Sequence, residues 1–253
     1  MMPLKSRTLV LMVSVGLTMA LVTGCTFGSG VDGDEVSGPV GSQNQSAPPL
    51  QDFTDQVAVI ATWDSACPPM NLEPVVDQFE GMESAEYRSE TGDFGLAPEA
   101  IWNAICVADL SDPESGALFD VSLSISAFDT NVLAFEHYEA VTSVAAELHS
   151  EAEVDQEFEL GVDSAWSASR ITAQENPTQQ TLQRPLAAAA LLGDFYAIQI
   201  LVRFDPDTAE MKGCAADEEP DCVMTATSMA EFFATSGYLE DLHAGIEAAI
   251  DAA

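Results

Sequence analysis

The chain has 253 residues and carries 42 acidic side chains against 7 lysines and arginines, which gives a formal charge of −35 at neutral pH. This charge argues against nucleic acid as a partner, because nucleic-acid binding depends on Lys and Arg side chains that neutralise phosphates. Hydrophobic residues make up 47% of the chain, so we interpret the acids as a solvated coat on a folded core rather than as a sign of disorder.

The first 24 residues have the three parts of an export signal. Lys5 and Arg7 provide a basic start, an apolar run of roughly thirteen residues follows, and small residues end the segment. The apolar run is too short for the ~20 residues that a membrane-spanning helix needs. Residues 1–24 are therefore predicted to be a signal peptide. Its removal takes away two basic residues and lowers the formal charge from −35 to −37.

The end of this signal, Leu21-Val22-Thr23-Gly24-Cys25, resembles the lipobox of bacterial lipoproteins. The resemblance implies that the Cys25 thiol receives a diacylglyceryl group and that cleavage makes Cys25 the new N-terminus. Two acyl chains, such as palmitate, anchor a protein stably, whereas a single chain binds only marginally. We therefore expect a lipid anchor that holds the protein on the extracytoplasmic face of the cell membrane. The alternative is a plain secretory signal with an incidental cysteine.

Four further cysteines follow Cys25, at positions 67, 106, 214 and 222. An even number of cysteines in an exported protein indicates two disulfides, for which three pairings are possible. We favour Cys67–Cys106 and Cys214–Cys222, because each pair lies within one local segment. Zinc is the rival interpretation, but the spacing matches no zinc knuckle. No metal and no cofactor is expected.

Residues 25–50 are predicted to be the lipidated cysteine and a disordered linker, because Gly, Ser, Asp, Gln and Pro dominate and large apolar residues are nearly absent. A flexible coil of about 25 residues spans roughly 25–30 Å between its ends, which would lift the following domain away from the bilayer. Residues 51–253 are predicted to form one domain on this tether, because their number is usual for a single core.

The first part of this domain is predicted to combine helix and strand. Helical spacing of apolar residues predicts a helix over Asn71–Phe79, whereas residues 57–62 fit either a short strand or a helical turn. Ser84–Arg88 and Asn103–Leu110 are predicted strands. Ala117–Ala127 alternates apolar residues with Asp and Ser, which predicts a strand with one buried face and one solvent-exposed face.

A long helix is predicted to begin at Asp129 or Thr130 as its N-cap and to run to about Ser150. We interpret its apolar stripe as core packing rather than as a ligand site. The stripe consists of Val132, Phe135, Tyr138, Val141, Val144 (or Ala145) and Leu148. Residues 151–159 are predicted to be an acidic connection, and a strand that runs to about Thr172 follows.

The last part of the domain is predicted to contain a hairpin and a broken helix. Leu186–Leu192 and Phe195–Phe204 flank Gly193-Asp194, a two-residue hairpin signal. In the second arm, the even-numbered residues from 196 to 204 would face the core, and Gln199 and Arg203 the opposite side. Met224–Ala252 is predicted to be helical, with a break at Ser236-Gly237.

In this order the elements resemble a group of actinobacterial surface lipoproteins of unknown function that share one small α+β domain. The resemblance is carried by Cys67, by Cys106 with its strand, by Gly161–Trp166 and by the Gly193-Asp194 hairpin. It implies an α+β fold in which a curved antiparallel sheet is packed by a long central helix and C-terminal helices. It implies no activity and no catalytic residue.

Candidates for chemistry are few. None of the three histidines, His137, His149 and His243, belongs to a His-Glu-x-x-His motif, so we interpret them as solvated helix residues. The acidic segment 205–221 could attract Ca²⁺, but it lacks the register of an EF-hand loop, and we interpret it as a solvated charge run.

These features predict a non-enzymatic lipoprotein that binds or scaffolds an envelope protein, or that carries a lipid or another small apolar ligand. Gln199 and Arg203 are candidates for its binding surface, although a pair with a nearby carboxylate explains Arg203 more simply. The alternative is a secreted hydrolase with an unrecognised active site. A deep cleft lined by His137, or by a close carboxylate pair with raised pKa values, would favour the hydrolase. A dry apolar cavity between sheet and helix would favour a carrier, and a filled core would favour a scaffold.

Overall fold

The structure is a computed structural model that describes residues 48–79, 83–84, 87–92, 97–111, 118–149, 156–174, 184–204, 211–212 and 223–252. The chain divides into two compact units, residues 1–44 and 45–253, and all of these residues belong to the second unit. The predicted signal peptide, Cys25, Cys214, Cys222 and most of the acidic segment 205–221 lie outside the described residues. No helix in the described part is long and apolar enough to span a membrane.

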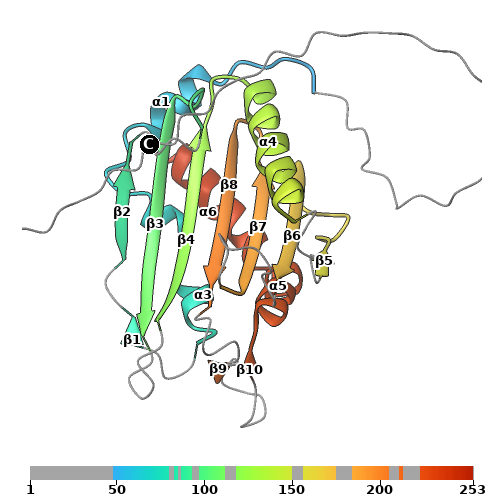
Figure 1. Ribbon diagram of the computed structural model, residues 1–253. Helices are drawn as coiled ribbons and strands as arrows, with labels where there is room; N and C mark the ends of the chain where they lie inside the picture. Colours follow the sequence, from blue (N-terminus) through green and yellow to red (C-terminus); the bar gives the residue numbers. More distant parts are fainter. Residues whose placement is uncertain are drawn as a thin grey trace, which may run out of the picture. The chain divides into compact units, whose positions relative to one another are not determined.

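Eight of the described strands form one antiparallel sheet in the order β1-β3-β4-β8-β7-β6-β5, and β2 pairs with β3 (Figure 1). The longer strands lie in its centre: β3 (Trp102–Ser111), β4 (Leu118–Ala127), β8 (Tyr196–Arg203), β7 (Leu186–Leu192) and β6 (Ala168–Gln174). The strands at its edges are short: β1 (Glu83–Ser84), β2 (Arg88–Thr91) and β5 (Gln156–Phe158). A separate ribbon pairs β9 (Met211–Lys212) with β10 (Val223–Met224). The predicted α+β fold with a curved antiparallel sheet is confirmed.

One face of this sheet, which we call the core face, is apolar and fully buried. Cross-strand neighbours form a continuous row through Cys106, Leu123, Ile200, Ala189 and Ile171. All five side chains are inaccessible to solvent. Because successive strand residues point to opposite faces, every second residue of the central strands joins this core.

Five helices pack on the core face: α1 (Thr54–Ile60), α2 (Cys67–Met70), α3 (Glu73–Val76), α5 (Ala226–Thr235) and α6 (Tyr238–Asp251). A capping box in which Thr225 and Ser228 bond each other's backbone N–H groups begins α5. The predicted break between the C-terminal helices is confirmed at Gly237, whose φ of 81° is the left-handed conformation that glycine adopts at no steric cost.

The remaining described helix, α4 (Asn131–His149), packs on the opposite face, which we call the second face. It lies over β7 and β8 (Figure 1). Thr130, rather than Asp129, caps it, because the Thr130 hydroxyl accepts a hydrogen bond of 3.3 Å from the Leu133 N–H group. The long central helix that the resemblance implied is therefore confirmed.

Of the predicted apolar stripe of α4, Tyr138 is buried as expected, and the side chains of Val144, Ala145 and Leu148 lie outside the described residues. Ala134, Tyr138 and Thr142 are buried, whereas Val132 and Phe135 are only half-buried. The sheet beneath presents small residues, Ala190 and Ala197 among them, so small side chains of α4 can approach it closely. Thr142 satisfies its hydroxyl group internally by donating a hydrogen bond of 2.9 Å to the Tyr138 carbonyl.

Three other predictions of local structure were wrong or incomplete. The predicted helix over Asn71–Phe79 is only the single turn α3, because after Val76 the chain changes to i→i+3 hydrogen bonds such as that from the Phe79 N–H group to the Val76 carbonyl at 3.0 Å. Residues 83–84 and 88–91 belong to two strands rather than one. The acidic connection contains β5, which pairs with β6. Residues 57–62 resolve to the end of a helix, since α1 runs to Ile60.

A disulfide and a hydrogen-bonded clamp fix the N-terminal part of the domain. Cys67 of α2 is bonded to Cys106 of β3, with Cα atoms 5.1 Å apart, which confirms this predicted pair.

The hydrogen-bonded clamp is formed at the beginning of α4. Asn131 accepts a hydrogen bond of 2.9 Å from the Gln51 N–H group and donates one of 2.9 Å to the Pro49 carbonyl. The Phe53 N–H group donates a further hydrogen bond of 2.7 Å to the Asp129 carbonyl. The chain therefore enters the domain at the beginning of α4.

Candidate functional site

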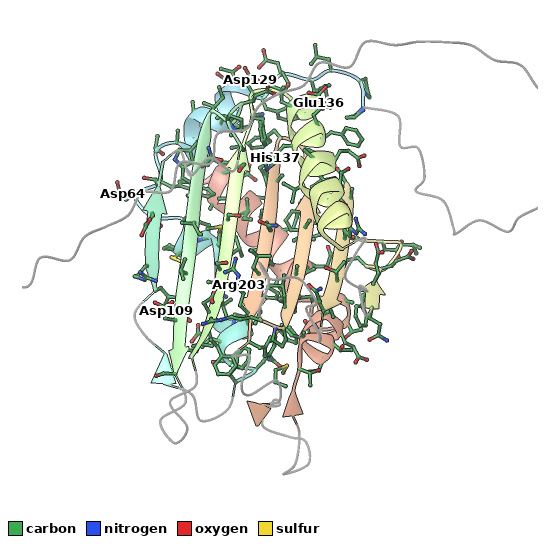
Figure 2. The ribbon with its side chains drawn as sticks, viewed as in Figure 1. Asp64, Asp109, Asp129, Glu136, His137 and Arg203 are labelled. Carbon is green, nitrogen blue, oxygen red and sulfur yellow. A yellow bond between two sulfur atoms is a disulfide. The ribbon has the colours of Figure 1, made fainter. Side chains whose placement is uncertain are left out.

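The second face is covered by α4 over only part of its area. Figure 2 shows α4 over one side of the sheet, with Arg203 and Asp109 on the surface that it leaves free. Val107, Ser122 and Leu201 are cross-strand neighbours there, and Val107 and Leu201 are half-buried although they lie in the long central strands. Among the described residues, no helix packs over this row. We call this surface the open face.

A row of paired charges crosses the open face. Asp109 of β3 lies opposite Asp120 of β4, and Asp120 lies opposite Arg203 of β8. Arg88 donates a bond of 2.7 Å to Asp109, and Arg203 donates one of 2.5 Å to Asp120. Arg184 approaches the other oxygen of Asp120 at 3.5 Å. These five residues, Arg88, Asp109, Asp120, Arg184 and Arg203, are called the arginine row below.

The position of Arg203 fits both of the ideas that its sequence context suggested. It lies on the face opposite to the core, as predicted, and it pairs with a carboxylate. Gln199 lies on the same face, at the edge of α4. Sequence patterns did not indicate Arg88 or Arg184, because their partners Asp109 and Asp120 lie 21 and 64 residues away in the chain. The alternation of residues along β4 and β8 could have placed Asp120 and Arg203 on the same face of the sheet. It could not have shown that they lie opposite each other.

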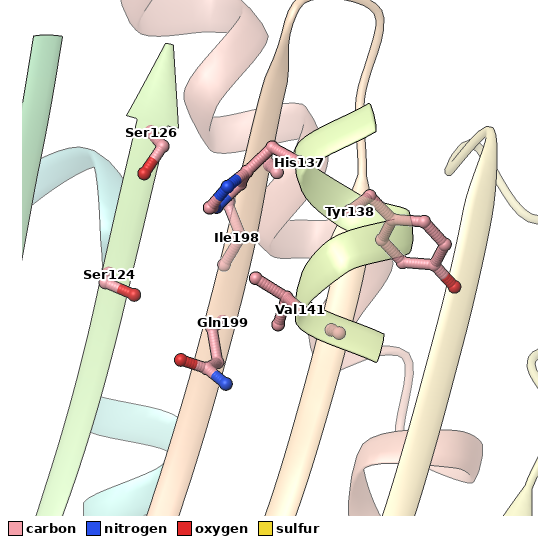
Figure 3. Close-up of a pocket in the computed structure, with 9 residues that line it drawn as sticks. Ser124, Ser126, His137, Tyr138, Val141, Ile198 and Gln199 are labelled. Carbon is pink, nitrogen blue, oxygen red and sulfur yellow. The ribbon is translucent and has the colours of Figure 1, made fainter. Parts of the chain in front are cut away.

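A small cavity lies between α4 and the sheet, where Figure 3 shows His137 directed toward β4 and β8. Its volume is about 40 Å³. The lining residues are Ser124, Ser126, His137, Tyr138, Val141, Ala190, Ala197, Ile198 and Gln199. This volume holds about three water molecules, since one water needs about 10–15 Å³. Ligand pockets usually exceed about 300 Å³.

Burial changes the chemistry of two cavity residues. It lowers the pKa of His137, whose ring packs 5.3 Å from that of Phe128. It raises the pKa of Tyr138 to about 12. Both side chains are therefore neutral at pH 7, since burial in a medium of low dielectric constant disfavours the charged form of each.

The prediction that the histidines are solvated was wrong for two of them. His137 is half-buried in the cavity wall, and half-buried His243 packs edge-to-face against Trp166 with ring centroids 4.9 Å apart. The side chain of His149 lies outside the described residues. The prediction that the serines of β4 are exposed to solvent was also wrong in part, because Ser122 and Ser126 are buried. Ser126 lies beside α4 and donates a hydrogen bond of 2.7 Å to Asn103.

Two wider depressions are open to solvent. One, of about 290 Å³, lies between Gln51, Asn131 and Asp194, where the chain enters the domain. The other, of about 240 Å³, is lined by Cys67 and Tyr87 among others, beside the disulfide. Neither is enclosed by the sheet and a helix. No group of three or more His, Cys, Asp or Glu side chains that could hold a metal ion occurs in the described part of the chain.

The fold and this surface define an α+β domain in which helices close one face of a sheet and leave part of the other face accessible. No known protein family, no curated protein and no solved structure matches the chain.

Proposed function

We propose that this protein is a lipid-anchored extracytoplasmic lipoprotein of the cell envelope whose domain binds another envelope protein through the open face. The anchor is supported by the export signal that ends at Cys25. The binding role is carried by one observation: the second face presents half-buried apolar side chains and arginines that no described helix covers.

Protein binding is better supported than the carriage of an apolar ligand. The cavity between α4 and the sheet has a volume of about 40 Å³, and the core face is filled by side chains of the sheet and five helices. A lipid would need a cavity several times larger, of at least about 300 Å³. The same size limit applies to a substrate that would have to reach His137.

The anchor can be tested with a Cys25→Ser variant of the full-length chain, expressed in a bacterium that processes lipoproteins. The wild-type chain is expected in the membrane fraction, with a mass that corresponds to removal of residues 1–24 and addition of a diacylglyceryl group. The variant is expected to keep its signal and to lack that group. Identical masses and fractions for the two proteins would contradict the anchor.

The choice between a partner protein and a carried lipid can be tested by native mass spectrometry of the acylated chain released from membranes. We expect the mass of the polypeptide with its covalent anchor and no further lipid. A discrete additional mass of lipid size, retained after detergent removal, would contradict the binding role and direct attention to the space beneath α4.

A further inference from the structure

The few basic residues of the chain are unevenly distributed. Outside the predicted signal there are five, of which Lys212 belongs to the β9–β10 ribbon. The other four are the arginines 88, 170, 184 and 203, and each of them forms an ion pair on the second face. Arg170 lies beside α4, where it donates a bond of 2.9 Å to the Thr142 carbonyl. The other three belong to the arginine row.

The arginine row carries more positive than negative charge. Its three guanidinium groups face two carboxylates, because Arg184 and Arg203 share Asp120. The side chains remain accessible, with 59%, 42% and 38% of the surface of Arg88, Arg184 and Arg203 exposed. A guanidinium group has five N–H donors, and a single ion pair occupies a minority of them. Each arginine can therefore bind a second carboxylate without releasing the first.

Pairing within the row also keeps the arginines in place. Asp109 and Asp120 lie directly opposite each other on neighbouring strands, an arrangement in which like charges repel. The guanidinium groups relieve this repulsion, so their positions are set before any partner arrives. Preorganised donors lose less conformational entropy when they bind an anion than free surface side chains do.

The neighbours of the row distinguish between two kinds of anionic partner. Val107 and Leu201 flank Ser122 on the adjacent row, and both aliphatic side chains are half-buried. Protein interfaces combine apolar side chains with arginine and are depleted of lysine, whereas sites for polyanions gather basic groups alone. Glu90 also faces this side from β2, opposite Ile105, and its carboxylate would repel any anionic group placed over it, in a polyanion or in a protein.

We infer that the open face docks an acidic protein surface: an apolar patch of the partner covers Val107, Ser122 and Leu201, and carboxylates at its edge bind the arginine row. This inference rests on the proposed role as a binding domain and adds the chemistry of the partner. The net charge of the chain is −35. Within the part of the chain that the structure describes, the arginine row gathers three guanidinium groups on one surface, where they can bind an acidic partner.

The small number of arginines allows a direct test by NMR. After processing, the acylated chain in detergent micelles has four arginines, so selective labelling should give four Nε–Hε signals, each assigned by one substitution. The probe is a short peptide of alternating Glu and Val, added at about 0.1 M NaCl, where the Debye length is about 10 Å and distant acids are screened. Peptides of alternating Lys and Val, and inorganic polyphosphate, are the comparison probes.

We expect the Glu-Val peptide to shift the signals of Arg88, Arg184 and Arg203 saturably and to leave Arg170 unchanged. The double variant Arg88→Gln/Asp109→Asn neutralises one pair without leaving an unpaired charge, because Asp109 pairs with no other arginine of the row. It should weaken binding of the peptide at least about tenfold, or about 1.4 kcal/mol. The matched control Arg170→Gln/Glu157→Gln neutralises the pair beside α4 and should leave the affinity unchanged.

Three results would overturn the inference. No saturable shift with the Glu-Val peptide, or equal weakening by both double variants, would show that the arginine row does not recognise acidic protein segments. Binding of polyphosphate at the same signals with equal or higher affinity would make the row a polyanion site instead. The proposed function is judged separately by the Cys25→Ser fractionation and by native mass spectrometry, which do not depend on the arginine row.

Discussion

The two faces of the sheet are made by the same strands, yet they are built differently. On the core face, the row through Cys106, Leu123 and Ile200 is fully buried beneath helices. One residue away on each strand, the neighbouring row through Val107, Ser122 and Leu201 is only partly covered. The difference shows that alternation alone defines two faces, whereas the number of helices that pack on each decides which one is a core.

The largest effect is expected from a truncation on the core face. Phe119 is 2% exposed, and its ring lies 6.1 Å from those of both Phe79 and Phe204. Phe119→Ala should cost about 3–5 kcal/mol of the free energy of unfolding, because a buried ring leaves a cavity. The matched change Leu201→Ala on the open face should cost about 1 kcal/mol. Urea unfolding measures both, and equal losses would mean that the open face is covered in solution.

Removal of the disulfide should have the next largest effect. Cys67 and Cys106 are 39 residues apart in the sequence, and their bond joins α2 to the core face. The double variant Cys67→Ala/Cys106→Ala should lose about 2–4 kcal/mol, because the unfolded chain regains the entropy of the closed loop. Urea midpoints with and without reductant provide the measurement. The urea midpoint of the wild type in reductant should approach that of the variant. A variant as stable as the oxidised wild type would show that the disulfide does not stabilise the domain.

A smaller loss is expected where the β7–β8 hairpin meets the core face. A Cβ atom at Gly193 would lie 2.6, 2.7 and 2.9 Å from three ring atoms of Tyr196, which is fully buried. Gly193→Ala should therefore cost about 1–3 kcal/mol through overpacking. Gly161→Ala is the matched control, since a Cβ atom there would meet nothing within 4 Å. Thermal midpoints of the two variants compare them, and equal midpoints would contradict the clash.

The smallest effect concerns pH and the cavity beneath α4. Burial lowers the pKa of His137, so the unfolded chain binds its proton more readily than the folded chain does. The stability that this difference contributes is complete above the unfolded pKa of about 6.5 and is lost as the pH falls from there through the folded pKa. The urea midpoint should thus fall less between about pH 7.5 and about pH 5 in His137→Gln than in the wild type. Equal falls would mean that the imidazole is solvated.

Elements with a strong local signal were predictable from the sequence. The alternation in β4, the hairpin of β7 and β8 and the break at Gly237 all depend on neighbouring residues, and each is confirmed within one or two positions. The Gly193 N–H group bonds the Tyr196 carbonyl, so Asp194 and Phe195 form the tip of the hairpin, one residue later than predicted. The pair Cys67–Cys106 was predictable because both cysteines lie in one segment.

The candidate site was much less predictable, because it depends on which strands become neighbours. Asp109 and Asp120 are close in sequence, but Arg203 is 83 residues from Asp120 and meets it through the pairing of β4 with β8. No local pattern specifies that pairing. The burial of Ser126 likewise depends on α4 crossing a sheet whose alanines permit close contact. Contacts between segments that are distant in the chain therefore determine the arginine row and the burial of Ser126, and local sequence patterns do not predict such contacts.

The hydrogen bonds of Asn131 have a mechanical consequence. Tension on the chain before Pro49 passes first to the N-terminal turn of α4 and to the segment after β4, through Asn131, Asp129 and the pairing of Asp52 with Thr130. Because β4 lies inside the sheet, such a pull meets several strands loaded together rather than an edge strand that could be peeled away one hydrogen bond at a time. Drag on the domain would then strain this clamp before it reached the short edge strands.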